Sequence, residues 1–202
     1  MTPARRIVLA TTNPDKIREI RSILDDLPIE LATLADFPPV DPPEETGTTF
    51  AENAALKATY YSRATGVPAV AEDSGLEIDA LDGAPGIHSA RFGGETATYP
   101  ERFGKLYEML DARGGRDSTA RFVCHVALAH GDRVIFEARG VVEGRVSPEP
   151  RGTHGFGYDP IFFHPPSGMT LAEVSDERKR AVSHRGEAFR KLAEFLRSHA
   201  CS

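Results

Sequence analysis

Cysteine is scarce in this sequence, and long apolar runs are missing from it. The 202 residues include two cysteines, Cys124 and Cys201. Two are too few for a disulfide framework, so a reducing cytoplasm is expected. No apolar run approaches the ~20 residues of a membrane span, and Ile7–Ala10 is too short for the apolar centre of a signal peptide. We therefore expect a cytoplasmic protein without a membrane partner.

An excess of basic residues is also missing. The net charge is -6, whereas nucleic-acid binders are usually basic, so no nucleic-acid partner is expected. A local basic pocket can still bind a small anion. The sequence has no Walker-type glycine loop, its seven histidines show no zinc-ligand spacing, and it contains no internal repeat. Its ordinary composition predicts one globular domain, residues 1–202.

The most informative stretch is an apolar run that ends in two acidic residues. Val67–Ala71 predicts a buried strand, and Glu72 and Asp73 follow at once. Ser74-Gly75 is expected to turn the chain tightly, with a second strand over Leu76–Ala80. Adjacent strand residues point to opposite sides, so at most one acid faces a given site, and Asp73, beside the turn, is the better candidate. The alternative is a solvated strand end.

A helix is predicted directly after the first strand, Ile7–Thr11. Asn13 is a good N-cap, Pro14 suits the first helical position, and Asp15 favours the first turn. Free backbone N–H groups and the positive end of the helix dipole would bind an anion, and Lys16 adds a full charge. The alternative is a well-capped helix with a surface lysine.

The next stretch is a loop that leads into a second helix. Residues 34–47 are rich in proline and acid. Within them Glu44 and Glu45 are candidate metal ligands, although solvated side chains are the more common case. Thr49 and Glu52 form a capping box for the following helix. Lys57 on that helix would reach a phosphate if its face lines a cleft, and is otherwise solvated.

The second half of the chain contains a predicted hairpin and a glycine-aromatic loop. Thr119–Ala129 and Arg133–Val146 predict two strands joined by a short turn, which implies some antiparallel sheet. In Gly152–Pro160, glycines alternate with Phe156 and Tyr158, so the backbone can approach a flat ligand and an aromatic ring can stack on a base. Many such loops are only turns.

Together these motifs resemble the inosine triphosphate pyrophosphatase family, the house-cleaning nucleoside triphosphate pyrophosphatases. They occur in family order along nearly the whole chain. The chain departs from the family pattern at three positions. It has Thr12 and His154 where glycine is more frequent, and Glu72 where aspartate is more frequent. The matching stretches are Thr11-Thr12-Asn13 with Lys16, Glu45-Thr46-Gly47, Phe50-Ala51-Glu52-Asn53-Ala54 with Lys57, Glu72-Asp73-Ser74-Gly75-Leu76, Gly83-Ala84-Pro85-Gly86-Ile87, Gly155-Phe156-Gly157-Tyr158-Asp159-Pro160 and Ser183-His184-Arg185-Gly186.

The resemblance implies an α/β fold, with a mixed central sheet flanked by helices and a substrate cleft between two lobes. It also implies a homodimer that hydrolyses deaminated purine nucleoside triphosphates (ITP, dITP and XTP) to the monophosphate and pyrophosphate with Mg²⁺. The chemistry of the residues fits this reaction, because a triphosphate needs a metal ion and lysines to neutralise its charge.

Residue by residue, the resemblance implies that Asp73 is the general base and, with Glu45 or Glu44, a metal ligand. Ser74 contacts the substrate. The residues matching the phosphate-binding elements are Thr11, Thr12, Asn13, Pro14, Asp15, Lys16 and Lys57. Those matching the elements that hold the base are Phe156, Gly157, Tyr158, Asp159, Lys179, His184 and Arg185.

Two other functions stay open at this point. One is a related pyrophosphatase for modified pyrimidine nucleotides or dTTP, against which the Gly155–Asp159 and Ser183–Arg185 motifs argue. The other is a non-catalytic nucleotide sensor on the same fold. Asp73, Lys16 and Lys57 are all present, so the sequence gives no sign of lost activity.

Overall fold

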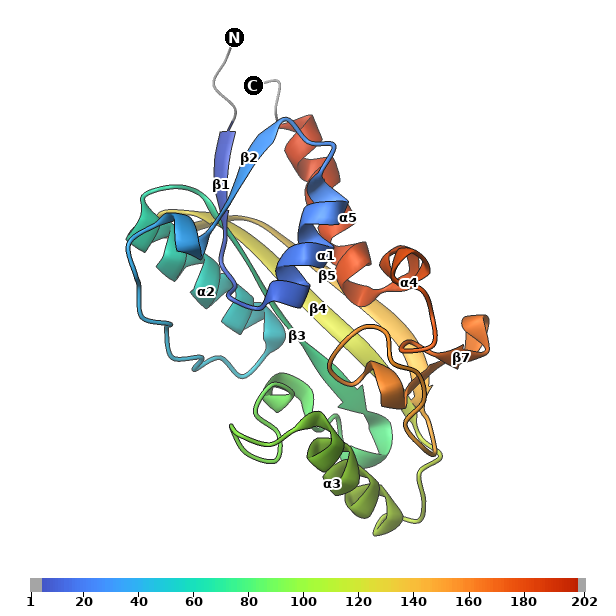
Figure 1. Ribbon diagram of the computed structural model, residues 1–202. Helices are drawn as coiled ribbons and strands as arrows, with labels where there is room; N and C mark the ends of the chain where they lie inside the picture. Colours follow the sequence, from blue (N-terminus) through green and yellow to red (C-terminus); the bar gives the residue numbers. More distant parts are fainter. Residues whose placement is uncertain (1–4, 200–202) are drawn as a thin grey trace. The chain divides into compact units, whose positions relative to one another are not determined.

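The structure is a computed structural model that describes residues 5–199 (Figure 1). Cys201 and the two ends of the predicted domain 1–202 lie outside the described residues. Across residues 5–199, no helix combines the length and the apolar character that crossing a membrane requires.

The strands form one mixed sheet in the order β2-β1-β3-β4-β5-β6-β7. β1 pairs in parallel with β2 and β3, whereas β6 pairs antiparallel with β5 and β7. The predicted mixed sheet flanked by helices is therefore confirmed. The strands are β1 (Arg5–Leu9), β2 (Ile29–Thr33), β3 (Ala69–Ile78), β4 (Thr119–His130), β5 (Arg133–Val146), β6 (Phe162–His164) and β7 (Met169–Thr170).

The helices begin where the sequence supplies capping residues. Asn13 caps the first helix, Thr49 and Glu52 form the predicted capping box of the second, and Gly66 ends that helix at φ +71°. The α-helices are α1 (Pro14–Leu24), α2 (Phe50–Thr65), α3 (Tyr99–Asp111), α4 (Asp176–Val182) and α5 (His184–Ser198). The short 3₁₀ helices are η1 (Leu34–Asp36), η2 (Asp79–Leu81), η3 (Gly86–His88), η4 (Asp159–Ile161) and η5 (Pro165–Ser167).

The chain divides into two compact units. Of the described residues, unit 1 contains 5–73, Cys124–Gly140 and 185–199, and unit 2 contains Ser74–Val123 and Val141–His184. Each unit has its own apolar core. In unit 2, α3 buries its apolar stripe against β3, β4 and the 158–162 segment.

In unit 1, alternation along the strands creates two cores on opposite faces of the sheet. Ile7 and Leu9 of β1 pack with α1 and α5, whereas Val8 packs with α2. β3 follows the same rule, because Val70 joins the first group and Ala69 and Ala71 join the second. α1 and α5 therefore share one face of the strands, and α2 covers the other (Figure 1).

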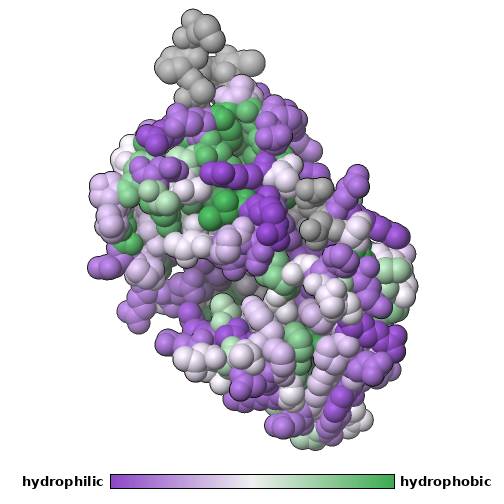
Figure 2. All heavy atoms as spheres, viewed as in Figure 1, coloured by the Kyte–Doolittle hydropathy of each residue, from purple (hydrophilic) through white to green (hydrophobic). Residues whose placement is uncertain are grey.

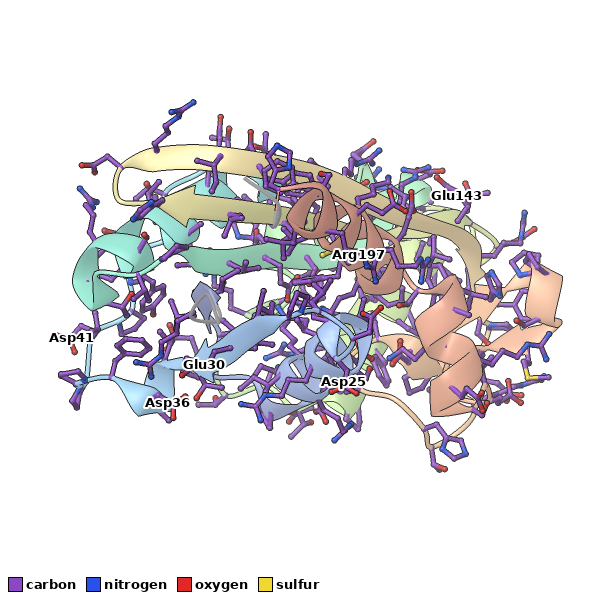
Figure 3. All side chains as sticks on the ribbon, turned by 90° about the horizontal axis from the view of Figure 1, so that it is seen from above. Asp25, Glu30, Asp36, Asp41, Glu143 and Arg197 are labelled. Carbon is purple, nitrogen blue, oxygen red and sulfur yellow. The ribbon has the colours of Figure 1, made fainter. Side chains whose placement is uncertain are left out.

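Hydrophilic side chains make up most of the face shown in Figure 2. On the face shown in Figure 2, hydrophobic atoms gather over the part of unit 1 that contains β1 and β2. β2 is an edge strand of the sheet, and its Ile29 and Leu31 are half-buried. Acidic side chains such as Glu30, Asp36 and Asp41 are exposed around the same edge (Figure 3), which keeps it polar.

The predicted turn at Ser74-Gly75 is wrong. β3 runs without a break from Ala69 to Ile78, so Glu72 and Asp73 lie within a strand and not at its end. Gly75 does not form a turn; it allows Gly86 and Ser89 to lie close to the strand. A Cβ at this position would lie 2.4 Å from the Gly86 carbonyl oxygen and 2.4 Å from the Ser89 hydroxyl, so the segment after β3 can pack on the strand only if residue 75 has no side chain.

Candidate active site

The first part of the site is the junction between β1 and α1. The Asn13 side chain accepts hydrogen bonds from the backbone N–H groups of Asp15 (3.0 Å) and Lys16 (3.1 Å). The predicted helix start is thus confirmed, but the expectation of free amides needs correction, because Asn13 occupies these two and Pro14 has none. What remains for an anion is the helix dipole and the Lys16 side chain.

Lys16 belongs to a buried cluster of charges. Its Nζ lies 2.6 Å from Oε1 of Glu72, whose side chain is 0% exposed. Arg185 approaches the same Oε1 at 3.3 Å and also contacts Glu19 at 2.7 Å. The Cys124 thiol donates to Oε2 of Glu72 at 3.3 Å. Glu72 therefore joins α1, α5 and β4 through a single carboxylate.

Electrostatics keep this carboxylate charged. Burial alone would raise the pKa of Glu72, but Arg185 and Lys16 outweigh burial and hold the pKa well below its usual value. Since the folded pKa is depressed, the cluster stabilises the fold above the pKa of an unfolded glutamate, and this stabilisation is lost as the pH falls through the folded pKa. Burial and the neighbouring Glu72 raise the pKa of Cys124, which stays a thiol.

We predict that Arg185→Met lowers the free energy of unfolding by about 3–5 kcal/mol, because it leaves Glu72 buried with Lys16 as its remaining cationic partner. Arg197→Met on the same helix is the matched control (Figure 3). Arg197 and its partner Asp26 are 49% and 67% exposed, so this variant should lose less than about 1 kcal/mol. Urea unfolding of both variants measures the difference, and equal losses would contradict the assignment of Arg185 to a buried charge cluster.

The second part of the site surrounds Asp73 on the other face of β3. Oδ1 of Asp73 accepts from Lys57 Nζ at 2.9 Å, and Oδ2 accepts from Asn53 Nδ2 at 3.4 Å. Lys57 also contacts Oε1 of Glu45 at 2.8 Å. The prediction that the two adjacent acids point to opposite sides is confirmed, since Glu72 meets α1 and α5 whereas Asp73 meets α2.

The environment of Asp73 suits a proton acceptor. Burial raises its pKa above the usual value, Lys57 opposes this rise, and the nearby carboxylates Glu45 and Glu72 add to it. A carboxylate whose pKa is raised binds a proton more readily, which is what a general base at neutral pH needs. Burial lowers the pKa of Lys57, but Asp73 and Glu45 outweigh burial and raise it, so Lys57 stays charged.

The loop before α2 brings one of the two candidate glutamates to this group. The N–H of Gly47 donates to Oδ1 of Asn53 at 2.8 Å, and the Glu52 carboxylate accepts from the N–H of Thr49. These bonds fix the end of the loop, so that Glu45 is half-buried beside Lys57, whereas Glu44 is exposed. The role of Glu44 as a metal ligand stays a prediction.

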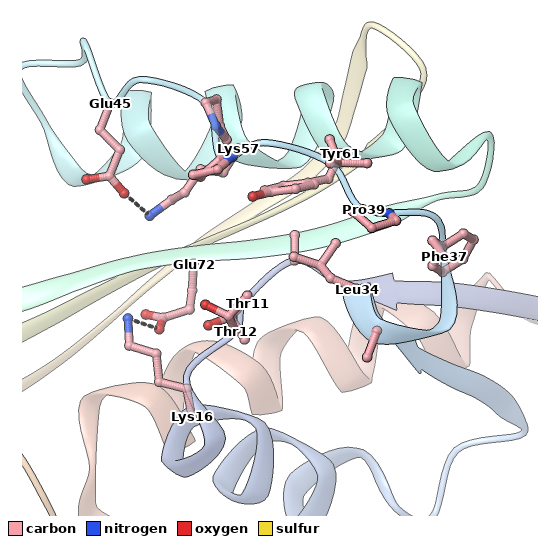
Figure 4. A pocket seen from close by; sticks show the side chains of 15 residues that line it. Thr11, Thr12, Lys16, Leu34, Phe37, Pro39, Glu45, Lys57, Tyr61 and Glu72 are labelled. Atoms are coloured by element: carbon pink, nitrogen blue, oxygen red, sulfur yellow. Dashed lines mark hydrogen bonds and ion pairs between the residues drawn. The ribbon is translucent and has the colours of Figure 1, made fainter.

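A cavity of about 600 Å³ in unit 1 is lined by members of both charged groups, although Asp73 is not among the described residues that line it (Figure 4). Lys57 and Glu45 lie on one side of it, and Lys16 and Glu72 lie on the other. Apolar residues of segment 34–43, together with Tyr61, form the remaining wall. The polar lining residues are Thr11, Thr12, Lys16, Glu45, Lys57 and Glu72. The two lysines of this lining suit an anionic ligand, and the two glutamates beside them suit a cation.

The carboxylates near Lys57 fit Mg²⁺. Glu45 and Asp73 are hard oxygen donors, and their shared contact with Lys57 places them within reach of one small cation. Within residues 5–199, no group of three or more His, Cys, Asp or Glu side chains forms a metal cage. Mg²⁺ is commonly bound by one or two carboxylates, with water and substrate phosphates as its other ligands, and this donor set meets that pattern.

In unit 2, the glycine-aromatic loop is held together by Asp159. Its Oδ2 accepts from the N–H of Phe156 at 2.7 Å and from Lys179 Nζ at 2.6 Å. Lys179 lies 4.6 Å from the centre of the Phe156 ring, a cation–π distance. Gly155 has φ +69°, and a Cβ there would lie 2.2 Å from Oδ2 of Asp159. The structure thus brings these predicted base-binding residues together.

The other predicted base-binding residues have different surroundings. Tyr158 is buried, donates to the Ser89 carbonyl oxygen at 2.8 Å and packs edge-on against Tyr99, so it anchors the loop that carries Gly157. The His184 ring is buried and stacks on Phe122, with 4.9 Å between ring centres. Their roles toward a substrate stay predictions.

Three residues that contact the site were absent from the sequence-based set. Asn53 appeared only within the Phe50–Ala54 motif, and its one-turn spacing from Lys57 was the available signal. For Glu19 and Tyr61 the sequence offered no signal, because an acidic residue on the polar face and an aromatic residue on the apolar face are ordinary in amphipathic helices. Glu72 was named without a partner, since its contacts come from distant segments.

The chain is similar to known proteins over nearly its whole length. A model of the Ham1 family matches residues 7–195. The dITP/XTP pyrophosphatase of Shigella flexneri is 47% identical over 196 residues, covering 96% of this chain and 99% of the relative. A dITP/XTP pyrophosphatase of Thermus thermophilus is 48% identical over 194 residues, with coverages of 96% and 93%. A HAM1 protein structure from Coxiella burnetii matches with TM-score 0.90 and 43% identity, covering 96% of this chain and 99% of that one.

Proposed function

The chain belongs to the Ham1 family, and from this premise we propose that it hydrolyses deaminated purine nucleoside triphosphates, namely ITP, dITP and XTP, to the monophosphate and pyrophosphate. It is a nucleoside triphosphate pyrophosphatase and removes these compounds from the nucleotide pool. The observation that carries the proposal is the Asp73–Lys57–Glu45 group, found in a chain that is 47% identical to a dITP/XTP pyrophosphatase.

In the proposed mechanism, a carboxylate oxygen of Asp73 takes a proton from the water that attacks the α-phosphorus. The bond from the α-phosphorus to the oxygen bridging to the β-phosphate breaks, and pyrophosphate leaves. Lys16 and Lys57 supply positive charge to the phosphates. Mg²⁺, when bound, neutralises further negative charge, and Glu45 and Asp73 would hold it.

The proposed recognition of the base uses Phe156, Asp159, Lys179, His184 and Arg185. Phe156 stacks on the purine, while Asp159 fixes the loop by holding the Phe156 N–H and Lys179. His184 and Arg185 donate hydrogen bonds, and Ser74 contacts the substrate. We further propose that the protein is a homodimer and that it acts in the cytoplasm. Light scattering of the purified protein measures the oligomeric state, and a tagged copy reports the location.

We predict that ITP yields IMP and pyrophosphate in equal amounts, because attack occurs at the α-phosphorus. When the reaction runs in water enriched in ¹⁸O, the label should enter IMP and be absent from pyrophosphate, as mass spectrometry of both products reports. Stepwise release of orthophosphate with accumulation of IDP would contradict the proposal, and so would label in pyrophosphate. An assay without Mg²⁺ should show no turnover.

A further inference from the structure

Asn53 is a buried polar residue that the proposed mechanism does not use. It lies in the first turn of α2 and is 0% exposed. Its Oδ1 accepts from the N–H of Gly47 at 2.8 Å, and its Nδ2 donates to Oδ2 of Asp73 at 3.4 Å. Because Gly47 offers a donor and Asp73 an acceptor, these two neighbours fix the orientation of the Asn53 amide.

Both carboxylate oxygens of Asp73 are tied to the same loop through α2. Oδ1 is joined through Lys57 to Glu45, and Oδ2 is joined through Asn53 to Gly47. Asn53 and Lys57 are four positions apart on the helix, so their side chains share one face. Asp73 is therefore held at two points and cannot turn about its Cβ–Cγ bond without breaking a contact.

The loop fits closely against Asn53. A Cβ on Gly47 would lie 2.6 Å from Oδ1 of Asn53 and 2.8 Å from Cβ of Glu52. Real Cβ atoms do not approach that closely, so any side chain at position 47 would move the loop or turn the Asn53 amide. Position 47 thus allows Asn53 to be disturbed without substituting Asn53 itself.

We propose that Asn53 is a positioning residue for the general base. Its Nδ2 holds Oδ2 of Asp73, and its Oδ1 binds the N–H of Gly47, which links the base to the 45–47 loop. This inference rests on the proposed function, since it concerns the base of that reaction. Loss of the bond should reduce turnover while leaving most substrate contacts in place. Supporting bonds of this kind typically contribute 10–100-fold in activity.

The test compares Asn53→Asp, Gly47→Ala and the wild-type protein in ITP hydrolysis with Mg²⁺. Asn53→Asp keeps an acceptor for the Gly47 N–H but loses the donor to Asp73. We expect kcat to fall about 10–100-fold in both variants, with a much smaller change in KM. Each variant is also unfolded in urea, so that the loss of stability is known separately.

Ser62→Ala is the matched control. Ser62 is a buried polar residue on the same helix, bonded to the Val67 carbonyl oxygen at 2.8 Å and to the Gly131 N–H at 2.9 Å, and the structure gives it no bond to Asp73. It should lose stability but keep kcat. A normal kcat in folded Asn53→Asp and Gly47→Ala would overturn the inference, as would an equal loss of kcat in Ser62→Ala. An inactive wild-type protein would overturn the proposed function itself.

Discussion

Asp73→Asn should lower kcat for ITP by ~10²–10⁴ while the chain stays folded. Asparagine is nearly isosteric with aspartate, so it keeps the space between Lys57 and Asn53, but it cannot accept the proton of the attacking water. The raised pKa of Asp73, which burial causes, strengthens this expectation because it makes the carboxylate a better base.

The measurement is steady-state hydrolysis of ITP with Mg²⁺, which gives kcat, together with circular dichroism of the wild-type protein and both variants. Asp41→Asn is the matched control, because Asp41 is exposed and its backbone oxygen, which accepts from the Tyr60 hydroxyl at 2.8 Å, is unchanged by the substitution (Figure 3). That variant should keep the wild-type kcat. Near-normal turnover by a folded Asp73→Asn protein would exclude Asp73 as the base.

ITP and XTP should be hydrolysed far better than ATP and GTP, by a factor of ~10⁴ or more in kcat/KM against ATP. Hypoxanthine and xanthine carry an oxygen at C6, which accepts hydrogen bonds, whereas adenine carries an amino group, which donates. Donors from His184, Arg185 or backbone N–H groups of the 156–159 loop would pair with the oxygen. With adenine, the protein donors would face the 6-amino group, which is also a donor. A buried polar group left unpaired in this way weakens binding by about 1–3 kcal/mol, and by more when it is charged.

The Phe156 N–H is an exception among these donors, since Asp159 already accepts it. GTP shares the C6 oxygen, so its rejection requires that the 2-amino group meets no acceptor. The test is kcat/KM for ITP, XTP, ATP and GTP at one Mg²⁺ concentration. Equal kcat/KM values for ITP and GTP would contradict the house-cleaning function and would indicate a general nucleotide pyrophosphatase.

Local features of the fold could be predicted from the sequence because short-range rules determine them. The Asn13 cap and the Thr49–Glu52 capping box each involve residues at most three positions apart. The opposite directions of Glu72 and Asp73 follow from the two-residue period of a strand. The hairpin of β4 and β5 follows from a short turn between two apolar runs.

Contacts between distant segments could not be predicted in the same way. The pairing of Lys57 with Asp73 spans 16 residues and that of Arg185 with Glu72 spans 113, so both depend on how helices pack on the sheet. The error at Gly75 has the same origin. A glycine beside a polar residue is typical of a turn, but here it permits a close approach by Gly86 and Ser89.

The burial of Cys124 has a consequence for the behaviour of unit 1 toward oxidants. Thiols react with peroxides and electrophiles through their deprotonated form. Burial and the neighbouring Glu72 raise the pKa of Cys124 well above its usual value, and the side chain is 0% exposed. The folded core therefore presents no reactive sulfur at this position.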